Sequence, residues 1–353
     1  MVDRPLTGVV VVEAASYLTG PLAAKILGDL GADVVKVEPP SGDPFRRFGH
    51  IRDGIGAQFL NAHGGKRSIY ADLKDPVGRD HVQSLLDGAD VFIQNWRPGV
   101  AASLGLDADT IRARNPRLVA MSITGYGDDG PRASAPAFDA LIQAATGVTD
   151  LVRRYGRPDV LGTWLADKVT AFTAVQAILS ALVRRATTDD GCTISLPMLD
   201  AVAYFNFPDL FEHRTFLDDD SELELPVSTV MRTSDGFVAV APVSGAQIGR
   251  AVAAVGHPEW KELLKTAGGG RALAARMVAL LEQATTSLST ADVLARFEAA
   301  DVPASPVLTR DEHLNDPQVL HNEIYGQTTT DGHVVRTARF PARFDGVRLR
   351  AGG

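Results

Sequence analysis

The stretch GPLAAKILGDLGADVVKVEPPSGD, residues 20–43, decides the fold. Its Gly-Pro pair opens a predicted helix, Gly31-Ala32-Asp33 breaks that helix, and the valine-rich run 34–37 predicts a buried strand. Residues 9–12 are four valines, so the whole segment reads as strand, loop, helix and strand. This order is typical of the first half of a nucleotide-binding α/β unit.

The loop after the first predicted strand departs from the usual dinucleotide fingerprint. It holds one glycine, Gly20, where Gly-x-Gly-x-x-Gly would let the backbone approach a pyrophosphate. Glu38 ends the second predicted strand, where nicotinamide enzymes keep an acid for the ribose, so an oxidoreductase stays open as an alternative. The unit is therefore predicted to be Rossmann-like in build, with its ligand held in another way.

Composition excludes several classes of protein. The 353 residues suggest about two domains, and 45% apolar with 22% charged residues is the balance of a globular chain with a substantial core. The net charge of −8 argues against a general nucleic-acid binder. The single cysteine, Cys192, excludes an intrachain disulfide and is predicted to be a small buried hydrophobe. The eight histidines form no metal-ligand spacing, so no metal site is expected.

Strand and helix signals alternate over residues 1–211. We expect further strands at 68–73, 90–94, 117–123 and 193–196, and helices at 75–86, 165–185 and 199–211. Short apolar runs separated by helices predict a parallel sheet covered on both faces, in an α/β fold.

A smaller α+β domain is predicted after an acidic linker. The linker spans 212–228, and the small domain with its return segment spans 229–324. We expect a strand at 237–241 and helices near 246–255, 259–266, 271–284 and 290–300, with Gly268-Gly269-Gly270 as a connector. Residues from about 325 to 353, with a predicted strand at 334–336, are assigned to the large domain.

The sequence predicts a cytoplasmic protein. The first eight residues, MVDRPLTG, carry no apolar signal region. The longest apolar stretch, near 171–183, is interrupted by Thr173, Gln176 and Ser180, so we expect no membrane span.

Several cations lie near the ends of predicted strands. Lys66, Arg67 and Lys74 surround one strand, and Arg97 follows Trp96 after another. Each alone is typical of a solvated surface charge, but together they predict a pocket for a phosphorylated ligand, with an aromatic surface for a base.

Asp167 lies near the start of the long predicted helix. It is either an ordinary N-terminal helix acid or an ionised nucleophile held by helix amides. His50 and His63 flank a possible cleft loop without an evident partner. The sequence contains neither a G-x-S-x-G elbow nor a P-loop, which argues against a serine triad and a nucleoside triphosphatase.

Four segments carry a resemblance to a known family. They are KVEPPSGD (36–43), NWRPG (95–99), SITGYG (122–127) and WLADKVTAFTAVQAILSALVRR (164–185). In this order they resemble the class III CoA-transferases, which include formyl-CoA and carnitine CoA-transferases and α-methylacyl-CoA racemase. The resemblance covers about the first 205 residues almost continuously. It implies Asp167 as the catalytic aspartate and an interlocked homodimer of chains with a Rossmann-type large domain and a smaller one.

The resemblance also implies the substrates and their contacts. Acyl-CoA and a carboxylic acid would be the substrates, with no tightly bound cofactor, and backbone amides near Asp167 would stabilise the oxyanion. Ser103 and Pro39 stand where some members carry arginine, so phosphate binding would depend on Arg97 or Lys74. The implied CoA contacts are Tyr17, Leu18, Thr19, Pro39, Ala71, Asp72, Leu73, Lys74, Asn95, Trp96, Arg97, Ser103, Phe138 and Asp139.

One departure bears on the type of reaction. Phe138 stands where the racemase branch carries a histidine, directly before Asp139, and phenylalanine cannot move a proton. This favours CoA transfer. The alternatives are an acyl-CoA α-proton racemase that uses Asp167 and Asp139, and a catalytically silent CoA-binding protein.

Overall fold

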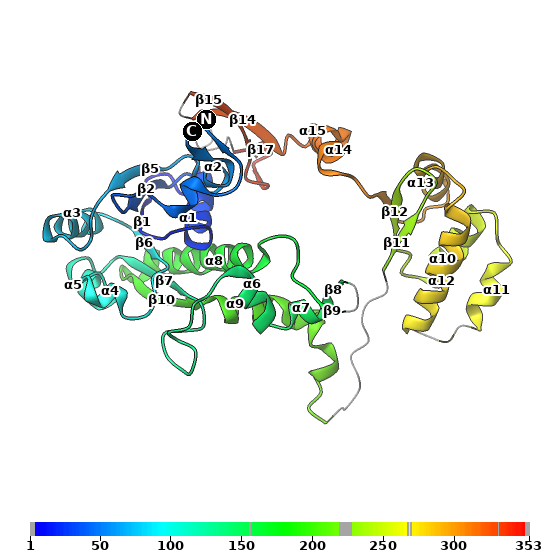
Figure 1. Ribbon diagram of the computed structural model, residues 1–353, viewed down its shortest axis with the longest axis horizontal. Helices are drawn as coiled ribbons and strands as arrows, with labels where there is room; N and C mark the ends of the chain where they lie inside the picture. Colours follow the sequence, from blue (N-terminus) through cyan, green and yellow to red (C-terminus); the bar gives the residue numbers. More distant parts are fainter. Residues whose placement is uncertain are drawn as a thin grey trace. The chain divides into compact units, whose positions relative to one another are not determined.

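The computed structural model describes residues 4–154, 157–218, 228–266, 268, 270–330 and 332–349. Its contacts divide the chain into two compact units (Figure 1). The larger unit is Met1–Thr215 with Glu323–Gly353, and the smaller is Phe216–Asn322. Within the predicted linker, Glu212–Arg214 form a short 3-10 turn (η2), and residues 219–227 lie outside the described residues.

A six-stranded parallel sheet forms the centre of the larger unit. Its order is β10-β7-β6-β1-β2-β5, with sequential strands placed on either side of β1. This is the doubly wound order, whose switch point lies between β1 and β6 and whose strands all end at one edge. The predicted α/β class with a parallel sheet is confirmed. The strands are β1 (Val10–Glu13), β2 (Asp33–Glu38), β5 (Arg67–Tyr70), β6 (Val91–Gln94), β7 (Val119–Thr124) and β10 (Cys192–Pro197).

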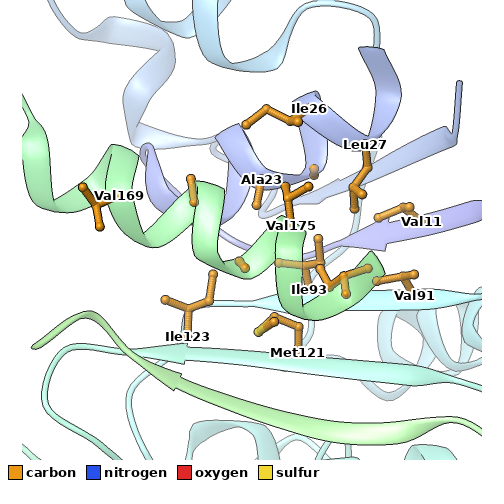
Figure 2. Close-up of a cluster of buried hydrophobic side chains, with 14 of the residues drawn as sticks. Val11, Ala23, Ile26, Leu27, Val91, Ile93, Met121, Ile123, Val169 and Val175 are labelled. Carbon is orange, nitrogen blue, oxygen red and sulfur yellow. The ribbon is translucent and has the colours of Figure 1, made fainter. Parts of the chain in front are cut away.

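Helices cover both faces because side chains alternate along each strand. Val11 and Ile93 point into the larger core beneath α1 and α8 (Figure 2), whereas Val12 and Phe92 point into the core beneath α3 and α5. Half-buried Cys192 packs at the margin of the larger core. The helices named here are α1 (Thr19–Asp29), α3 (Pro76–Leu86), α4 (Val100–Ser103), α5 (Ala108–Arg114), α8 (Leu165–Thr188) and α9 (Met198–Leu210).

Shorter elements complete the larger unit. Leu349 is buried in the larger core and Phe344 packs against it, so the last described residues belong to this unit. The elements are η1 (Pro44–Arg47), β3 (Ile51–Arg52), β4 (Ile55–Gly56), α2 (Ala57–His63), α6 (Asp139–Ala145), α7 (Val148–Leu151), β8 (Arg153–Arg154), β9 (Arg157–Pro158), β14 (Tyr325–Thr330), β15 (His333–Ala338), β16 (Arg343–Phe344) and β17 (Val347–Arg348).

The smaller unit is an α+β structure with its own core. Met231, Val238 and Phe297 are fully buried between a three-stranded antiparallel sheet and its helices. Gly270 is the first residue of α12, so the predicted glycine connector ends there, and residue 269 lies outside the described residues. The elements are β11 (Val230–Arg232), β12 (Phe237–Val240), β13 (Ala304–Pro306), α10 (Gly245–Ala254), α11 (Trp260–Lys265), α12 (Gly270–Thr285), α13 (Thr290–Ala299), α14 (Arg310–Asn315) and α15 (Pro317–His321).

Helix α8 is the one helix of the described residues that is long and apolar enough to cross a membrane, by length and composition. It is also the central helix of the larger core, where Ala171, Ala174 and Ile178 are fully buried. Packing against the sheet therefore accounts for its apolar composition.

Leu27 provides a test of this core. It is fully buried between α1 and the sheet (Figure 2), so Leu27→Ala should lower the free energy of unfolding by about 2–5 kcal/mol. Val77→Ala on α3 is the control, because that side chain is 73% exposed and its loss should change stability by about 0.5 kcal/mol or less. Urea denaturation of both variants checks this expectation, and equal costs would contradict it.

Candidate active site

Three segments of the larger unit meet at Asp167. This residue lies in the first turn of α8, and the Thr19 hydroxyl at the start of α1 donates a short hydrogen bond to its Oδ1. The backbone amides of Ala166 and Asp167 donate to Oδ1 of Asp139, the first residue of α6, at 2.7 and 3.2 Å. The structure therefore brings together Thr19, Asp139 and Asp167, which the sequence separates widely.

Asp139 acts as the cap of α8. The side chain of the residue is buried, and its second oxygen, Oδ2, accepts a hydrogen bond from Gln143 at 2.6 Å. Oδ1 thus joins the start of α6 to the start of α8, and Oδ2 is occupied by a hydrogen bond within α6. This use differs from the proton transfer that a racemase would require of Asp139, and from a direct CoA contact.

The first amides of α8 are not available to a substrate. Asp139 takes those of Ala166 and Asp167, while Leu165 and Lys168 donate to the carbonyl groups of Thr163 and Trp164. The expectation that backbone amides next to Asp167 stabilise an oxyanion is therefore wrong for this turn. The physical reason is that the fold uses them to join α8 to α6 and to its own preceding loop.

The environment of Asp167 sets its protonation. Burial, with a smaller contribution from the negative charge of Asp139, raises the pKa of Asp167 to about 6, although the Thr19 hydrogen bond and the charge of Lys168 oppose this shift. The carboxylate is still mostly ionised at pH 7, as expected for a nucleophile. The expected cause, helix amides that hold the anion, does not apply.

The loop between β1 and α1 is held in a strained shape. Tyr17 adopts the left-handed conformation with φ 65°, which is unfavourable for a residue with a side chain. Asn95 at the end of β6 clamps the preceding residue, because its amide exchanges two 2.9 Å hydrogen bonds with the backbone of Ser16. Gly20 follows, and a Cβ there would lie 2.4 Å from Ala15 Cβ. Asn95, predicted to contact CoA, thus uses its side chain to join the two strands at the switch point.

Aromatic rings belong to the segments that meet at Asp167. The rings of Tyr17 and Phe138 meet edge to face with centroids 6.1 Å apart, and they are 41% and 59% exposed. Phe45 lies behind Tyr17 at 6.3 Å and beside Trp164, the residue that precedes α8, at 5.8 Å. These rings place apolar surface on the segments next to the candidate nucleophile, which agrees with the pKa that burial raises.

The other implied CoA contacts follow the same edge of the sheet. Ala71 donates its amide to the Glu38 carbonyl at 2.9 Å, so the ends of β2 and β5, with Pro39, lie side by side. The Lys74 amide donates to Asp72. Three of these side chains are engaged within the protein. Leu18 is buried in a small core cluster and Leu73 is half-buried. The Ser103 hydroxyl donates a hydrogen bond to the Val100 carbonyl of its own helix.

Trp96 and Arg97 line a cavity of about 300 Å³ at the end of β6. The cavity lies on the face of the sheet that α4 and α5 cover, and Asp128 and Ser195 form its opposite side. Asp167 lies on the α8 face, and neither it nor Ser103 lines this cavity. Arg97, the predicted phosphate ligand, and Asp167, the predicted nucleophile, therefore lie on opposite faces of the sheet, on either side of the switch-point edge.

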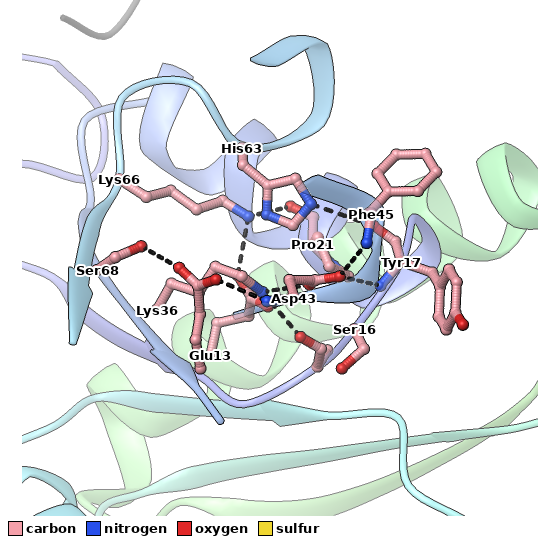
Figure 3. Close-up of polar contacts among 12 residues, drawn as sticks. Glu13, Ser16, Tyr17, Pro21, Lys36, Asp43, Phe45, His63, Lys66 and Ser68 are labelled. Atoms are coloured by element: carbon pink, nitrogen blue, oxygen red, sulfur yellow. Dashed lines mark hydrogen bonds and ion pairs between the residues drawn. The ribbon is translucent and has the colours of Figure 1, made fainter. Parts of the chain in front are cut away.

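Two of the cations predicted for the phosphate pocket, Lys66 and Arg67, form ion pairs elsewhere in the larger unit. The Lys66 side chain is 2% exposed, and its Nζ lies 2.8 Å from Glu13 Oε2 and 2.7 Å from the Pro21 carbonyl (Figure 3). Burial lowers the pKa of Lys66 to about 8. Arg67 pairs with Asp33, at the opposite end of β2. Their predicted role in a phosphate pocket is wrong, because one is enclosed and the other is distant from the site edge.

Glu38 is also unavailable to a ribose. Burial alone would raise its pKa, but hydrogen bonds from Arg46, Ser68 and the Asp43 amide lower the pKa of Glu38 to about 2. Both of its oxygens are occupied, which removes the main argument for a nicotinamide enzyme. The sequence did not reveal the partners of this acid or the buried charges Glu13, Lys36 and Asp43. For Glu13 and Lys36 the available signal was a charge within a valine-rich strand, whereas Asp43 lies in the loop after β2 and carried no such signal.

Comparison with known proteins identifies the family. Residues 6–352 match the family described as CoA-transferase family III. The chain belongs to this family. This CoA-transferase is 32% identical to the succinate–glutarate CoA-transferase of Agrobacterium fabrum, over 98% of the chain and 91% of that protein. It is 30% identical to the formyl-CoA:oxalate CoA-transferase of Streptomyces avermitilis, over 91% and 84%.

A solved structure of a CAIB/BAIF family protein from Brucella suis superposes on this CoA-transferase with a TM-score of 0.85. The two are 32% identical, and the match covers 99% of this chain and 94% of the other. The predicted family, and with it an enzyme that transfers CoA, is confirmed.

The raised pKa of Asp167 predicts a pH-dependent stability. The acid titrates near 6 in the folded chain and near 3.8 as a free side chain, so its ionised form opposes folding above pH 6. Asp167→Asn should therefore stabilise the fold at pH 8, by about 1–3 kcal/mol for a partly exposed group, and should have little effect at pH 4. Thermal unfolding at both pH values measures this. Asp80→Asn on the exposed face of α3 is the control, and a larger effect at pH 4 than at pH 8 would contradict the assignment.

Proposed function

We propose that this CoA-transferase moves CoA from an acyl-CoA donor to a free carboxylic acid through a covalent thioester on Asp167. One observation carries the proposal: a partly buried, partly exposed carboxylate at the switch-point edge, with a hydroxyl bonded to one oxygen and aromatic rings around its approach. Such a carboxylate is poorly solvated and held in one orientation, which favours nucleophilic attack.

In the proposed reaction the acyl group and CoA are exchanged between the substrates and Asp167, and water takes no part. The Asp167 carboxylate attacks the thioester carbonyl, which forms a mixed anhydride and releases CoA thiolate. The thiolate attacks the Asp167 carbonyl of that anhydride, which forms an aspartyl-CoA thioester and releases the donor acid. The acceptor carboxylate then repeats the two steps in reverse, so that acyl-CoA leaves and the Asp167 carboxylate is restored.

The oxyanion would be stabilised by α1 rather than by α8. Thr19 and Gly20 begin α1, and the first amides of a helix have no partner within the helix. The Thr19 hydroxyl bonds to Asp167, so this helix end lies beside the reacting group. We therefore assign the two amides and the helix dipole to the charge that develops on the acyl oxygen.

CoA would lie across the edge of the sheet. We place its pantetheine arm over the ends of β1, β2 and β6, and its phosphates near Arg97 or Lys74. The choice of acyl group is assigned to the smaller unit and to residues 212–228. Both substrates are charged metabolites, and we place the enzyme in the cytoplasm.

Replacement of Asp167 tests the nucleophile. Asp167→Ala should lower kcat by at least about 1,000-fold while CoA still binds, with a Kd by calorimetry that changes less than about threefold. In the unmodified enzyme, kcat should fall about tenfold per pH unit below pH 6, because protonation removes the nucleophile. Near-normal turnover by Asp167→Ala would remove the assignment.

Trapping separates transfer from the alternatives. Incubation with an acyl-CoA and hydroxylamine should convert the residue 167 side chain to a hydroxamate, which peptide mass spectrometry detects. CoA binding without any adduct would favour a silent binding protein, and deuterium at the α-carbon in heavy water would favour a racemase.

We further infer that two chains form an interlocked homodimer. Helices α6, α8 and α9 contact one another, and large apolar side chains on them are exposed in the single chain. Tyr204 and Phe205 on α9 are 83% and 57% exposed, and Phe172 on α8 is 52% exposed. Exposed rings gathered on neighbouring helices are typical of a protein interface.

The mass in solution tests the dimer, and subunit exchange tests the interlocking. Light scattering should give twice the 37.5 kDa chain mass, and Tyr204→Glu should weaken the assembly whereas Val77→Glu, on exposed α3, should not. Two differently tagged preparations should not exchange subunits over hours unless they are first unfolded. A monomer would overturn the dimer, and rapid exchange would overturn the threading.

A further inference from the structure

A cluster of buried charges lies behind the loop that leads to Thr19, and the reaction described above uses none of them (Figure 3). Its members are Glu13, Lys36, Asp43 and Lys66, whose side chains are each at most 2% exposed. Lys36 Nζ lies 2.9 Å from both Glu13 and Asp43, and Lys66 Nζ lies 2.8 Å from Glu13. Two carboxylates and two ammonium groups balance, but burying them stabilises a fold less than apolar packing does. Such a cluster indicates a role in fixing the geometry of the backbone around it.

The cluster holds the backbone on both sides of Tyr17. Lys36 donates to the Ala15 carbonyl at 2.9 Å, and Lys66 donates to the Pro21 carbonyl at 2.7 Å. The Tyr17 amide donates to Asp43 at 3.3 Å. The turn of residues 15–21 is therefore tied to charged side chains at its beginning, middle and end.

His63 completes these ties. Its Nε2 lies 3.1 Å from the Tyr17 carbonyl, which can only accept, so this nitrogen carries the proton. Burial and the charges of Lys66 and Lys36 lower the pKa of His63, so the ring is neutral. Its Nδ1 is buried without a hydrogen-bond partner among the described residues. The ring thus donates its one N–H to the Tyr17 carbonyl.

The turn needs such restraint because it is strained. A non-glycine residue in the left-handed region persists only where the surroundings impose it, and such strain is concentrated at functional sites. Tyr17 lies two residues before Thr19. The backbone at Gly20 lies so close to the Ala15 side chain that there is no space for a Cβ. If Tyr17 relaxed to an extended conformation, the Thr19 hydroxyl would move away from Asp167.

We propose that Lys66 and His63 are positioning residues, which hold the strained turn 15–21 so that the Thr19 hydroxyl stays on Asp167. The inference rests on the proposed function of Asp167. It gives Lys66 a role other than the phosphate contact predicted from the sequence, since its ammonium group is enclosed and bonded to Glu13 and the Pro21 carbonyl.

A double-mutant cycle on the full-length enzyme tests this role. Thr19→Val and Lys66→Met should each lower kcat about tenfold or more, and the double variant should be no worse than Lys66→Met within about twofold, because the loss of Lys66 already removes the Thr19 contact. The pH midpoint of kcat should rise in each variant, since the Thr19 hydrogen bond lowers the pKa of Asp167. Asp139 and Lys168, the other charges that act on Asp167, stay unchanged.

His63→Phe is the second variant, in case Lys66→Met unfolds because Glu13 Oε2 has lost its partner while Oε1 stays paired with Lys36. Phenylalanine keeps the ring stacked on Phe59, whose centroid lies 4.1 Å away, and removes the hydrogen bond to Tyr17. It should raise the same pH midpoint and lower kcat about threefold or more. Arg67→Met is the matched control, because this neighbouring cation pairs with Asp33 at the far end of the strand and its loss should leave kcat and the midpoint unchanged.

The outcomes separate this inference from the proposed function. Losses in kcat that multiply to about 100-fold in the double variant, or a pH midpoint that does not move in Lys66→Met or His63→Phe, would overturn the positioning role. In either case hydroxylamine would still trap Asp167, so CoA transfer through that residue would stand. Failure to trap Asp167 in the unmodified enzyme would overturn the proposed function instead.

Discussion

The contact between Asp139 and the first amides of α8 determines where the proposed nucleophile, Asp167, is held. Asp139 accepts from Ala166 and Asp167 with one oxygen and from Gln143 with the other, so α6 and α8 meet at a fixed point. Helix amides buried without a partner would be costly, and this carboxylate satisfies two of them. The same contact leaves the Asp167 side chain without amide donors of its own. The proposed nucleophile is therefore a carboxylate of raised pKa beside a carboxylate that has a structural role.

The edge of the sheet provides the second constraint. At the switch point the loops after β1 and β6 diverge, and Asn95 joins them through the backbone of Ser16. Behind this joint lies a set of buried charges, and in front of it lie exposed rings such as Tyr17 and Phe138. Polar restraint on one side and apolar surface on the other give a rigid site that excludes part of the solvent. Such a site strengthens electrostatic effects on a thioester carbonyl.

Stability and reactivity oppose each other at Asp167. Burial of the carboxylate disfavours its charged form and so weakens the fold at neutral pH, but it also leaves the anion poorly solvated. The left-handed backbone of Tyr17 adds a second local strain. The well-packed cores beneath α1 and α8 and beneath α3 and α5 offset both, because their strands are nearly completely enclosed.

Periodicity was sufficient for the six strands of the parallel sheet and for helices α1, α3, α8 and α9, and the family resemblance supplied the candidate nucleophile. The valine runs of β1 and β2 read correctly because a strand buried on both faces must be apolar along its length. Local patterns could not show that Lys66 turns inward to Glu13, that Glu38 is occupied by Arg46, or that Asp139 caps a helix 26 residues later in the chain, at Leu165. The first and third of these pairings join residues far apart in sequence, and a charged side chain looks the same in a sequence whether it faces water or an opposite charge. Only tertiary packing decides which of them is left free to react.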